Sequence, residues 1–304
     1  SMNKLETMFL GTKLKNPVLT ASGTFGFGDV FEQFFEVKRL GGIIGKGLTL
    51  KPKRGNEGQR VWETASGLMN SIGLENPGVK HYIEVELPKM KTVNDYVIAN
   101  MGGNSIEDYV EGAKLLDESI ADAIELNISC PNVKTGGMAF GIRCEDARTV
   151  VSKVREAVKN KPLIIKLSPN AENIVALAKT MEEIGADGVS LVNTFNALAI
   201  DVRTRKPRFN NVTAGLSGPA IKPIALRMVY EVSKNVNIPV IGIGGIENYK
   251  DALEFIMAGA TLVEIGSANL YNPTTAINVV EGLEKYAEKE IDKNIEEIRG
   301  CIWR

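Results

Sequence analysis

Residues 122–132 read DAIELNISCPN, an apolar run that ends in a thiol and a proline. The part 122–127 has the composition of a buried strand in a parallel sheet, and Pro131 cannot continue a hydrogen-bonded ladder. In barrels of parallel strands, the chemistry lies at the C-terminal ends of the strands. We therefore expect Asn127 and Cys130 to face a functional site, covered by the Gly-containing loop 132–141.

Seven further short apolar runs resemble this one, and helix-like segments separate them. The eight predicted strands are 17–21, 42–48, 96–101, 123–128, 163–167, 188–193, 239–242 and 262–266. Eight strands with crossover helices close most simply into a (β/α)8 or TIM barrel, an α/β fold that suits a single domain over residues 1–304. An open doubly wound sheet is the alternative.

Capping residues and acids mark where four of the helices begin. The four starts are Ser105 with Asp108, which resembles a capping box; Glu145 with Asp146; Asn170 with Glu172; and Asn248.

The connection 49–94, between the second and third strands, is too long to be a turn. It contains a basic run at 51–56, which most simply forms a solvated loop, and the stretch MNSIGLENPG at 69–78. Because it leaves the second strand at its C-terminal end, we expect an insertion over that face of the barrel.

Composition narrows the function classes. A formal charge of −1 and a pI near 6.1 argue against a protein that binds nucleic acid. No run of about 18 apolar residues and no signal-peptide pattern occur, so we expect no membrane partner and a cytoplasmic location. Three cysteines without paired spacing indicate free thiols in a reducing compartment.

Polar residues stand near the C-terminal ends of the predicted strands. Lys46 and Lys166 invite an anionic ligand, and Asn100, Asn127 and Asn193 supply amides that can hold a heterocycle. The alternative for each lysine is a buried carboxylate partner that serves stability alone.

Three glycine elements predict a phosphate-bearing ligand. Two follow the seventh and eighth strands, at 241–246 and 264–268, where barrel enzymes commonly bind phosphate through backbone N–H groups. A third, at 215–219, begins the long connection after the sixth strand. The run 242–245 opens no mononucleotide-binding unit with an acid about 20 residues further on, so it is not a Rossmann fingerprint.

Cys130 has two interpretations, a small buried hydrophobe or a general base activated by a lysine or by amide donors. Its place beyond a strand end favours the base, whereas Cys144 and Cys301 lack such neighbours. The only histidine, His81, falls inside the long connection and is expected at the surface or in packing. No cysteine or histidine spacing suggests a metal site.

These motifs resemble the dihydroorotate dehydrogenases over residues 16–271. Residues 127–132 resemble the family's catalytic loop, 70–74 its orotate-binding segment, and Gly244-Gly245 with Gly266-Ser267 its FMN phosphate site. A cysteine at the catalytic position resembles class 1. Residues 132–141 and 76–79 resemble the NAD-linked class 1B catalytic subunit more than the fumarate-linked class 1A enzyme.

The resemblance implies FMN-dependent oxidation of (S)-dihydroorotate to orotate in pyrimidine biosynthesis, with Cys130 removing a proton from C5 while a hydride passes from C6 to the flavin. Lys166 would stabilise negative charge on reduced FMN, and Lys46 would touch both flavin and substrate. The implied substrate-binding residues are Lys46, Asn70, Ser71, Ile72, Gly73, Leu74, Asn127, Asn193 and Thr194. The implied cofactor-binding residues are Ser22, Lys46, Gly47, Asn100, Asn127, Lys166, Val192, Gly218, Gly244, Gly245, Gly266 and Ser267.

The class 1B resemblance also implies a partner subunit that carries FAD and a [2Fe-2S] cluster and passes electrons to NAD. The expected assembly is a dimer of this chain flanked by two partners. The alternatives are a class 1A enzyme, another FMN barrel reductase of the dihydropyrimidine or dihydrouridine type, and a non-catalytic barrel that binds a phosphorylated ligand.

Overall fold

The computed structural model describes residues 2–128 and 143–304, so Cys130 and the loop 132–141 lie outside the described residues. Within those ranges, eight parallel strands form one sheet in which spatial neighbours follow the chain order. The strands are β3 (Val18–Thr20), β4 (Ile43–Ile44), β7 (Val97–Met101), β8 (Ala123–Asn127), β9 (Leu163–Leu167), β10 (Gly188–Leu191), β15 (Val240–Ile243) and β16 (Leu262–Ile265). Each coincides with a predicted strand.

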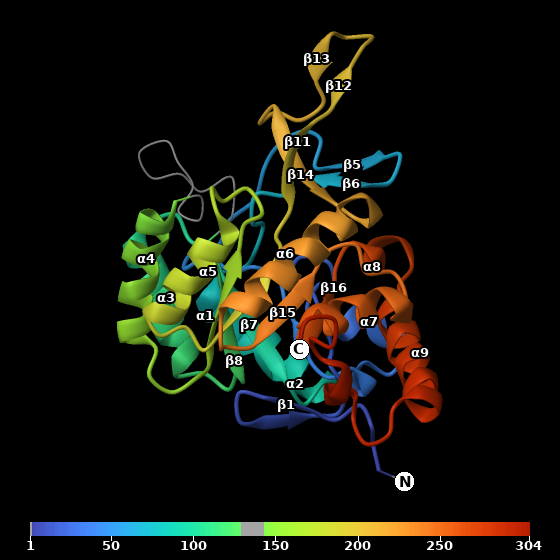
Figure 1. Cartoon of the computed structure of the whole chain (residues 1–304). Coiled ribbons are helices and arrows are strands. Elements are labelled where there is room, and N and C mark those ends of the chain that lie inside the picture. Colours follow the sequence, from blue (N-terminus) through green and yellow to red (C-terminus); the bar gives the residue numbers. More distant parts are fainter. Residues whose placement is uncertain (1, 129–142) are drawn as a thin grey trace.

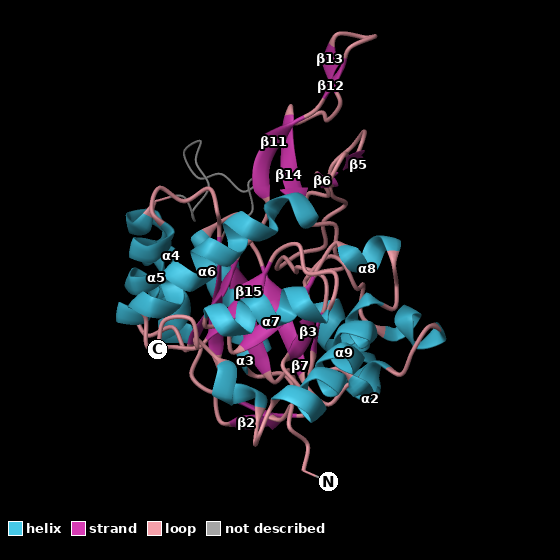
Figure 2. Cartoon of the chain, turned by 45° about the vertical axis from the view of Figure 1, so that its right-hand side comes forward, coloured by secondary structure: helices cyan, strands magenta, loops and turns pink. Residues whose placement is uncertain are grey.

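The sheet closes between β3 and β4, the strands at its two edges. The Gly41 N–H donates to Val18 O at 3.0 Å, and the Ile44 N–H donates to Thr20 Oγ1 at 3.3 Å. The result is a nearly closed barrel surrounded by helices (Figure 2). This confirms the predicted (β/α)8 class and excludes the open doubly wound sheet.

Helices surround the barrel on its outside (Figure 1). They are α1 (Val79–His81), α2 (Leu87–Val93), α3 (Ile106–Asp117), α4 (Cys144–Ala157), α5 (Ile174–Glu183), α6 (Lys222–Asn235), α7 (Tyr249–Ala258), α8 (Ala268–Tyr271) and α9 (Thr275–Glu290). Shorter helices are η1 (Asp29–Gln33), η2 (Val37–Arg39), η4 (Pro219–Ile221), η5 (Ile295–Ile298) and the π-helical turn η3 (Tyr82–Glu86). Ser105 caps α3 and Asn248 caps α7, as predicted.

The predicted start of α5 was wrong by one turn. Asn173, not Asn170, caps this helix through the Ala176 N–H. The Asn170 side chain instead donates to Thr194 O at 3.1 Å and accepts from the Asn196 N–H at 3.0 Å. It therefore ties the loop after β9 to the loop after β10.

The lower half of the barrel interior is apolar. Each strand places every second residue inside. The buried lower layer consists of Leu19, Ile44, Ile98, Ala123, Ile164, Ile241 and Leu262. Phe9 and Leu14, from a hairpin of β1 (Thr7–Phe9) and β2 (Thr12–Leu14), close this layer from below. The sequence analysis did not predict this hairpin.

Two excursions leave the barrel at the C-terminal ends of its strands. Residues 49–94 form the predicted insertion, with a hairpin of β5 (Val61–Thr64) and β6 (Gly67–Asn70) followed by α1, η3 and α2, which return to β7. The connection after β10 forms β11 (Phe195–Leu198), β12 (Ile200–Asp201), β13 (Lys206–Pro207) and β14 (Thr213–Ser217). β14 pairs with β6, while β12 and β13 project away from the barrel (Figure 1).

The second excursion corrects one reading of the sequence. The glycine element 215–219 lies in β14 and η4, so it ends the connection after β10 rather than beginning it.

Among the helices that the structure describes, none is both long and apolar enough to cross a membrane.

Candidate active site

Two asparagines and a threonine meet above β8 and β10. Asn193 Nδ2 donates to Asn127 Oδ1 at 3.2 Å, and the Thr194 N–H donates to Asn193 Oδ1 at 2.8 Å. Thr194 in turn packs against Gly215, where a Cβ would stand 2.0 Å from its Oγ1. The structure thus brings together three predicted substrate-binding residues and braces them against the excursion after β10.

Both predicted lysines lie at strand ends. Lys166 is the fourth residue of β9, is only 6% exposed, and pairs in register with Asn127 on β8. Lys46 follows β4 and is half-buried. Within residues 2–128 and 143–304, neither ammonium group makes a hydrogen bond or an ion pair within 4 Å. Neither lysine therefore has the carboxylate contact that a purely structural role would require.

Asn100 links the barrel interior to the residue after Lys46. Its Nδ2 donates to Glu125 Oε1 at 2.7 Å, whereas its buried Oδ1 has no partner among the described residues. A Cβ on Gly47 would stand 3.1 Å from this Oδ1, 3.1 Å from Leu74 Cδ2 and 3.6 Å from Ser22 Oγ. The absent side chain of Gly47 leaves an acceptor that a ring N–H of a bound heterocycle can satisfy.

The loop after β15 approaches the start of α6 very closely. Gly245 has φ +71°, and a Cβ there would stand 2.8 Å from Gly218 O and 2.7 Å from Lys222 Cβ. A Cβ on Gly244 would stand 3.7 Å from Val192 Cγ2. Only glycine permits this packing, which gathers predicted cofactor-binding residues from two connections, the one after β10 and the one after β15.

The loop after β16 lies on the adjacent strand. Gly266 has open space around it, since a Cβ there would meet only Ala21 Cβ at 3.6 Å. Ser267 precedes the single turn α8. These two residues therefore lie beside the end of β3, which Ser22 follows in the sequence.

The segment 70–74 returns from the hairpin to the barrel. Asn70 pairs with Gly215, and Ser71 Oγ accepts from Asn56 Nδ2 at 2.9 Å. Asn56 also packs against Gly73, and Ile72 O packs against Gly55. Leu74, at φ +57°, carries the chain to Gly47, so the segment ends beside the first residues of the site.

Two acidic residues of the barrel interior escaped prediction. Glu125 and Glu264 are fully buried, and each lies two residues before a predicted site residue, Asn127 and Gly266. Burial, most of all, raises the pKa of Glu264 well above its ordinary value, and the charge of Glu125 raises it further. The period of two along a strand was the available signal.

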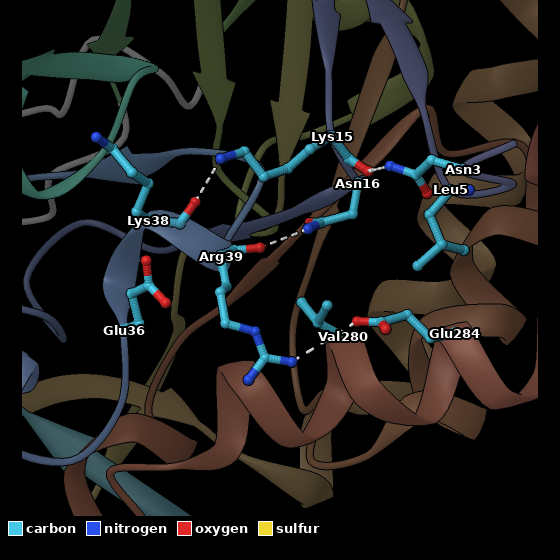
Figure 3. A pocket seen from close by; sticks show the side chains of 9 residues that line it. All are labelled: Asn3, Leu5, Lys15, Asn16, Glu36, Lys38, Arg39, Val280 and Glu284. Atoms are coloured by element: carbon cyan, nitrogen blue, oxygen red, sulfur yellow. Dashed lines mark hydrogen bonds and ion pairs between the residues drawn. The ribbon is translucent and has the colours of Figure 1, made fainter. Parts of the chain in front are cut away.

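A pocket of about 390 Å³ opens at the other end of the barrel (Figure 3). Its lining includes Arg39, which pairs with Glu284, and Lys15, which donates to Lys38 O at 2.6 Å. It contains no predicted site residue. His81 lies at the surface, as predicted, and its Nε2 is 3.4 Å from Glu86 Oε1.

Comparison with known proteins identifies the family. A family model described as dihydroorotate dehydrogenase matches residues 4–286. The chain belongs to the dihydroorotate dehydrogenase family. A curated relative from Petrotoga mobilis, named dihydroorotate dehydrogenase B (NAD(+)), catalytic subunit, is 56% identical over 96% of this chain and 97% of its own length. Relatives of the same name from Bacteroides thetaiotaomicron and Brachyspira hyodysenteriae are 50% and 49% identical, over 95% and 99% of this chain.

Membership of the dihydroorotate dehydrogenase family agrees with the chemistry of the strand ends. Two lysines, several amides and glycine-lined loops converge at one end of the barrel, where parallel-barrel enzymes bind their ligands. The relatives match nearly the whole chain.

Proposed function

We propose that this chain oxidises (S)-dihydroorotate to orotate with FMN, as the catalytic subunit of an NAD-linked dihydroorotate dehydrogenase in de novo pyrimidine biosynthesis. The observation that carries the proposal is Asn100 Oδ1, a buried acceptor without a partner among the described residues, which faces the open position at Gly47. Family membership and the relatives' shared name support it.

The residues present fit FMN. Asn100 Oδ1 can accept a flavin ring N–H, and Gly218, Gly244 and Gly245, which carry no side chain, allow a phosphate to approach the backbone closely. The residues proposed to hold FMN are Ser22, Lys46, Gly47, Asn100, Asn127, Lys166, Val192, Gly218, Gly244, Gly245, Gly266 and Ser267. Bound FMN supplies a hydride acceptor for C6 of dihydroorotate.

The side chains around this position bind and orient the substrate. The lysine ammonium groups favour the orotate carboxylate and the negative charge that develops during oxidation. Asn127, Asn193 and Thr194 form one connected group, which fixes the amide donors and acceptors that a pyrimidine ring needs. The segment 70–74 completes the proposed substrate site.

Cys130 is the proposed base that removes the C5 proton. It lies outside the described residues, and the proposal rests on its sequence position three residues after Asn127, whose backbone O accepts from Tyr109 OH at 2.7 Å. A thiolate near a lysine is a competent base at neutral pH.

The proposed electron route leaves this chain. The name of the relatives, a catalytic subunit linked to NAD(+), supports a partner subunit that takes up the electrons. That this partner carries FAD and a [2Fe-2S] cluster, in a heterotetramer built on a dimer of this chain, is proposed from the class 1B resemblance. The chain itself is proposed to be one FMN-binding domain, with 49–94 as its insertion, that works in the cytoplasm.

The test starts with purified chain reconstituted with FMN and reduced by dihydroorotate without air. We expect stoichiometric FMN binding and bleaching of its visible absorbance. Cys130→Ser should keep FMN but slow bleaching at pH 7 by about 10²-fold to 10⁴-fold, because serine is a far weaker base. Cys144→Ser, at the start of α4, is the matched control and should bleach at the wild-type rate.

Failure to bind FMN would refute the flavoenzyme proposal and favour a non-catalytic barrel. Equal bleaching rates for Cys130→Ser and wild type would remove Cys130 from the mechanism. Rapid fumarate reduction by the chain alone would instead assign it to the fumarate-linked class.

A further inference from the structure

The middle layer of the barrel interior is polar, in contrast to the apolar layer below it. Each of its residues stands two positions after a residue at the level of the lower layer. Around the barrel these positions are Ala21, Lys46, Asn100, Glu125, Lys166, Ser190, Ile243 and Glu264. The titratable groups at this level are thus two carboxyls and two lysines.

Glu125 has a donor for each carboxylate oxygen. Asn100 Nδ2 donates to Oε1 at 2.7 Å, and Ser190 Oγ donates to Oε2 at 2.9 Å. Ser190 is on β10, two strands away from β8, so this bond crosses the inside of the barrel. Both oxygens of Glu125 are therefore acceptors in this arrangement.

Glu264 has the opposite surroundings. It is fully buried, and neither of its oxygens finds a donor in the part of the chain that the structure describes. Glu125 nevertheless raises the pKa of Glu264, by its charge and by hydrogen bonding between the two side chains, although β8 and β16 are not neighbours. Two carboxyls can hydrogen-bond to each other only if one carries a proton, and an ionised Glu264 would be buried without solvation.

Lys166 belongs to the same layer as this pair. It is nearly buried, pairs in register with Ser190 on β10, and is close enough to Glu264 to act on its ionisation. Since no carboxylate lies within 4 Å of Lys166 among the described residues, its counter-charge comes from the acid pair at longer range.

We propose that Glu264 and Glu125 hold one proton between them, Glu264 as donor and Glu125 as acceptor, and that their single negative charge positions the Lys166 ammonium beneath the flavin. Glu264 and Glu125 are positioning residues, because they act through Lys166 and Asn100. The link to the flavin rests on the proposed function, whereas the shared proton does not.

The shared proton is tested first on flavin-free chain by infrared spectroscopy. At pH 7, the carbonyl band of a protonated carboxylic acid should be present in wild type and absent in Glu264→Gln. Glu156→Gln, an exposed acid on α4, is the matched control and should keep the band. Absence of the band from wild type at pH 7, or its persistence in Glu264→Gln, would overturn the proposal.

The pH dependence of unfolding gives a second readout without flavin. Above the ordinary pKa of 4.5, the folded state keeps a proton that the unfolded state loses, so wild-type stability falls as pH rises. The unfolding equilibrium constant of wild type, divided by that of Glu264→Gln, should rise by up to about tenfold per pH unit between pH 5 and 8. A ratio that does not change with pH would contradict the shared proton, and the wild-type infrared titration decides if the variant does not fold.

The link to the flavin is tested by the midpoint potential of bound FMN. Glu125→Gln removes the counter-charge of Lys166 and should raise the potential, because reduced flavin gains negative charge. Glu264→Gln removes only a neutral group and should leave the potential nearly unchanged. Equal potentials in all three proteins would overturn the positioning role, while failure to bind FMN would refute the proposed function and leave the infrared result standing.

Discussion

The N-terminal and C-terminal ends of the barrel treat buried polar side chains differently. At the N-terminal end, Asn94 is fully used: its Nδ2 donates to Val37 O and Leu40 O, and its Oδ1 accepts from the Tyr96 N–H. Toward the C-terminal end, Asn100, six residues later, leaves Oδ1 unpartnered within the described residues. The same type of side chain thus completes its hydrogen bonds within a loop at one end, whereas at the other end its oxygen is available to a ligand.

This difference separates stability from function. Completed hydrogen bonds at the N-terminal end stabilise the folded state, whereas buried acceptors without a partner at the C-terminal end cost folding free energy unless a ligand satisfies them. A substitution at the N-terminal end should therefore change the free energy of unfolding with little effect on FMN affinity. A substitution at the C-terminal end should change FMN affinity with little effect on the free energy of unfolding.

The largest effect is expected in the apolar lower layer. Ile164 is fully buried there, so Ile164→Ala should lower the free energy of unfolding by about 2–5 kcal/mol through lost burial and a cavity. Denaturant unfolding measures the loss, and Ile164→Val should lose only about 0.5–1.5 kcal/mol. The folded variant should keep its FMN affinity, and a large loss of affinity would break the separation.

Asp117 provides the next effect, through the loop that leads into β9. Burial alone would raise the pKa of its carboxyl, but N–H donors from Lys159, Asn160 and Lys161 outweigh burial and lower it. The stabilisation is thus complete above the unfolded pKa and disappears as pH falls through the lower, folded value. Asp117→Asn should cost about 1.5–3 kcal/mol at pH 7 and progressively less in acid.

Unfolding measured from pH 7 to pH 3 tests this dependence. Asp95→Asn is the matched control at the same barrel end, because the Asp95 side chain is 65% exposed and its ion pairs are long, at 3.5 and 3.7 Å. It should change stability by less than about 0.5 kcal/mol. An Asp117→Asn loss that stays constant with pH would show that the charge is not responsible.

The strands of this fold could be predicted from sequence because each is a short, continuous apolar run. The excursion after β10 could not, since β11 is alternately half-buried and exposed and, among the described strands, pairs with β14 alone. The α5 cap failed for another reason. Asn170 and Asn173 are equally good caps in isolation, and the tertiary contacts of Asn170 decide between them.

The site residues likewise divide into those that could be predicted from sequence and those that could not. Lys166 and Asn100 could be predicted because a polar residue inside an apolar run stands out. Glu125 stands in such a run too, but its meaning depends on Glu264, which comes from a strand that is not its neighbour. A proton shared across the barrel has no sequence signature, because only closure of the barrel brings the two carboxyls together.

The smallest expected effect gives the cleanest comparison of the two ends. Gly47→Ala adds a Cβ 3.1 Å from Asn100 Oδ1 and from Leu74 Cδ2, at a backbone conformation that alanine can adopt. FMN affinity should fall about tenfold, or about 1.4 kcal/mol, while the unfolding of flavin-free chain changes by less than about 0.5 kcal/mol. Fluorescence titration and denaturant unfolding measure the two quantities.

Gly188→Ala makes the same change at the N-terminal end of β10, where the new Cβ would stand 3.3 Å from Pro239 O. This variant should bind FMN as wild type does, because Gly188 begins its strand at the end away from the site. If Gly188→Ala lost FMN as strongly as Gly47→Ala, the two ends would be coupled through the strand. If only Gly47→Ala loses FMN affinity, the open space at Gly47 is part of the cofactor site.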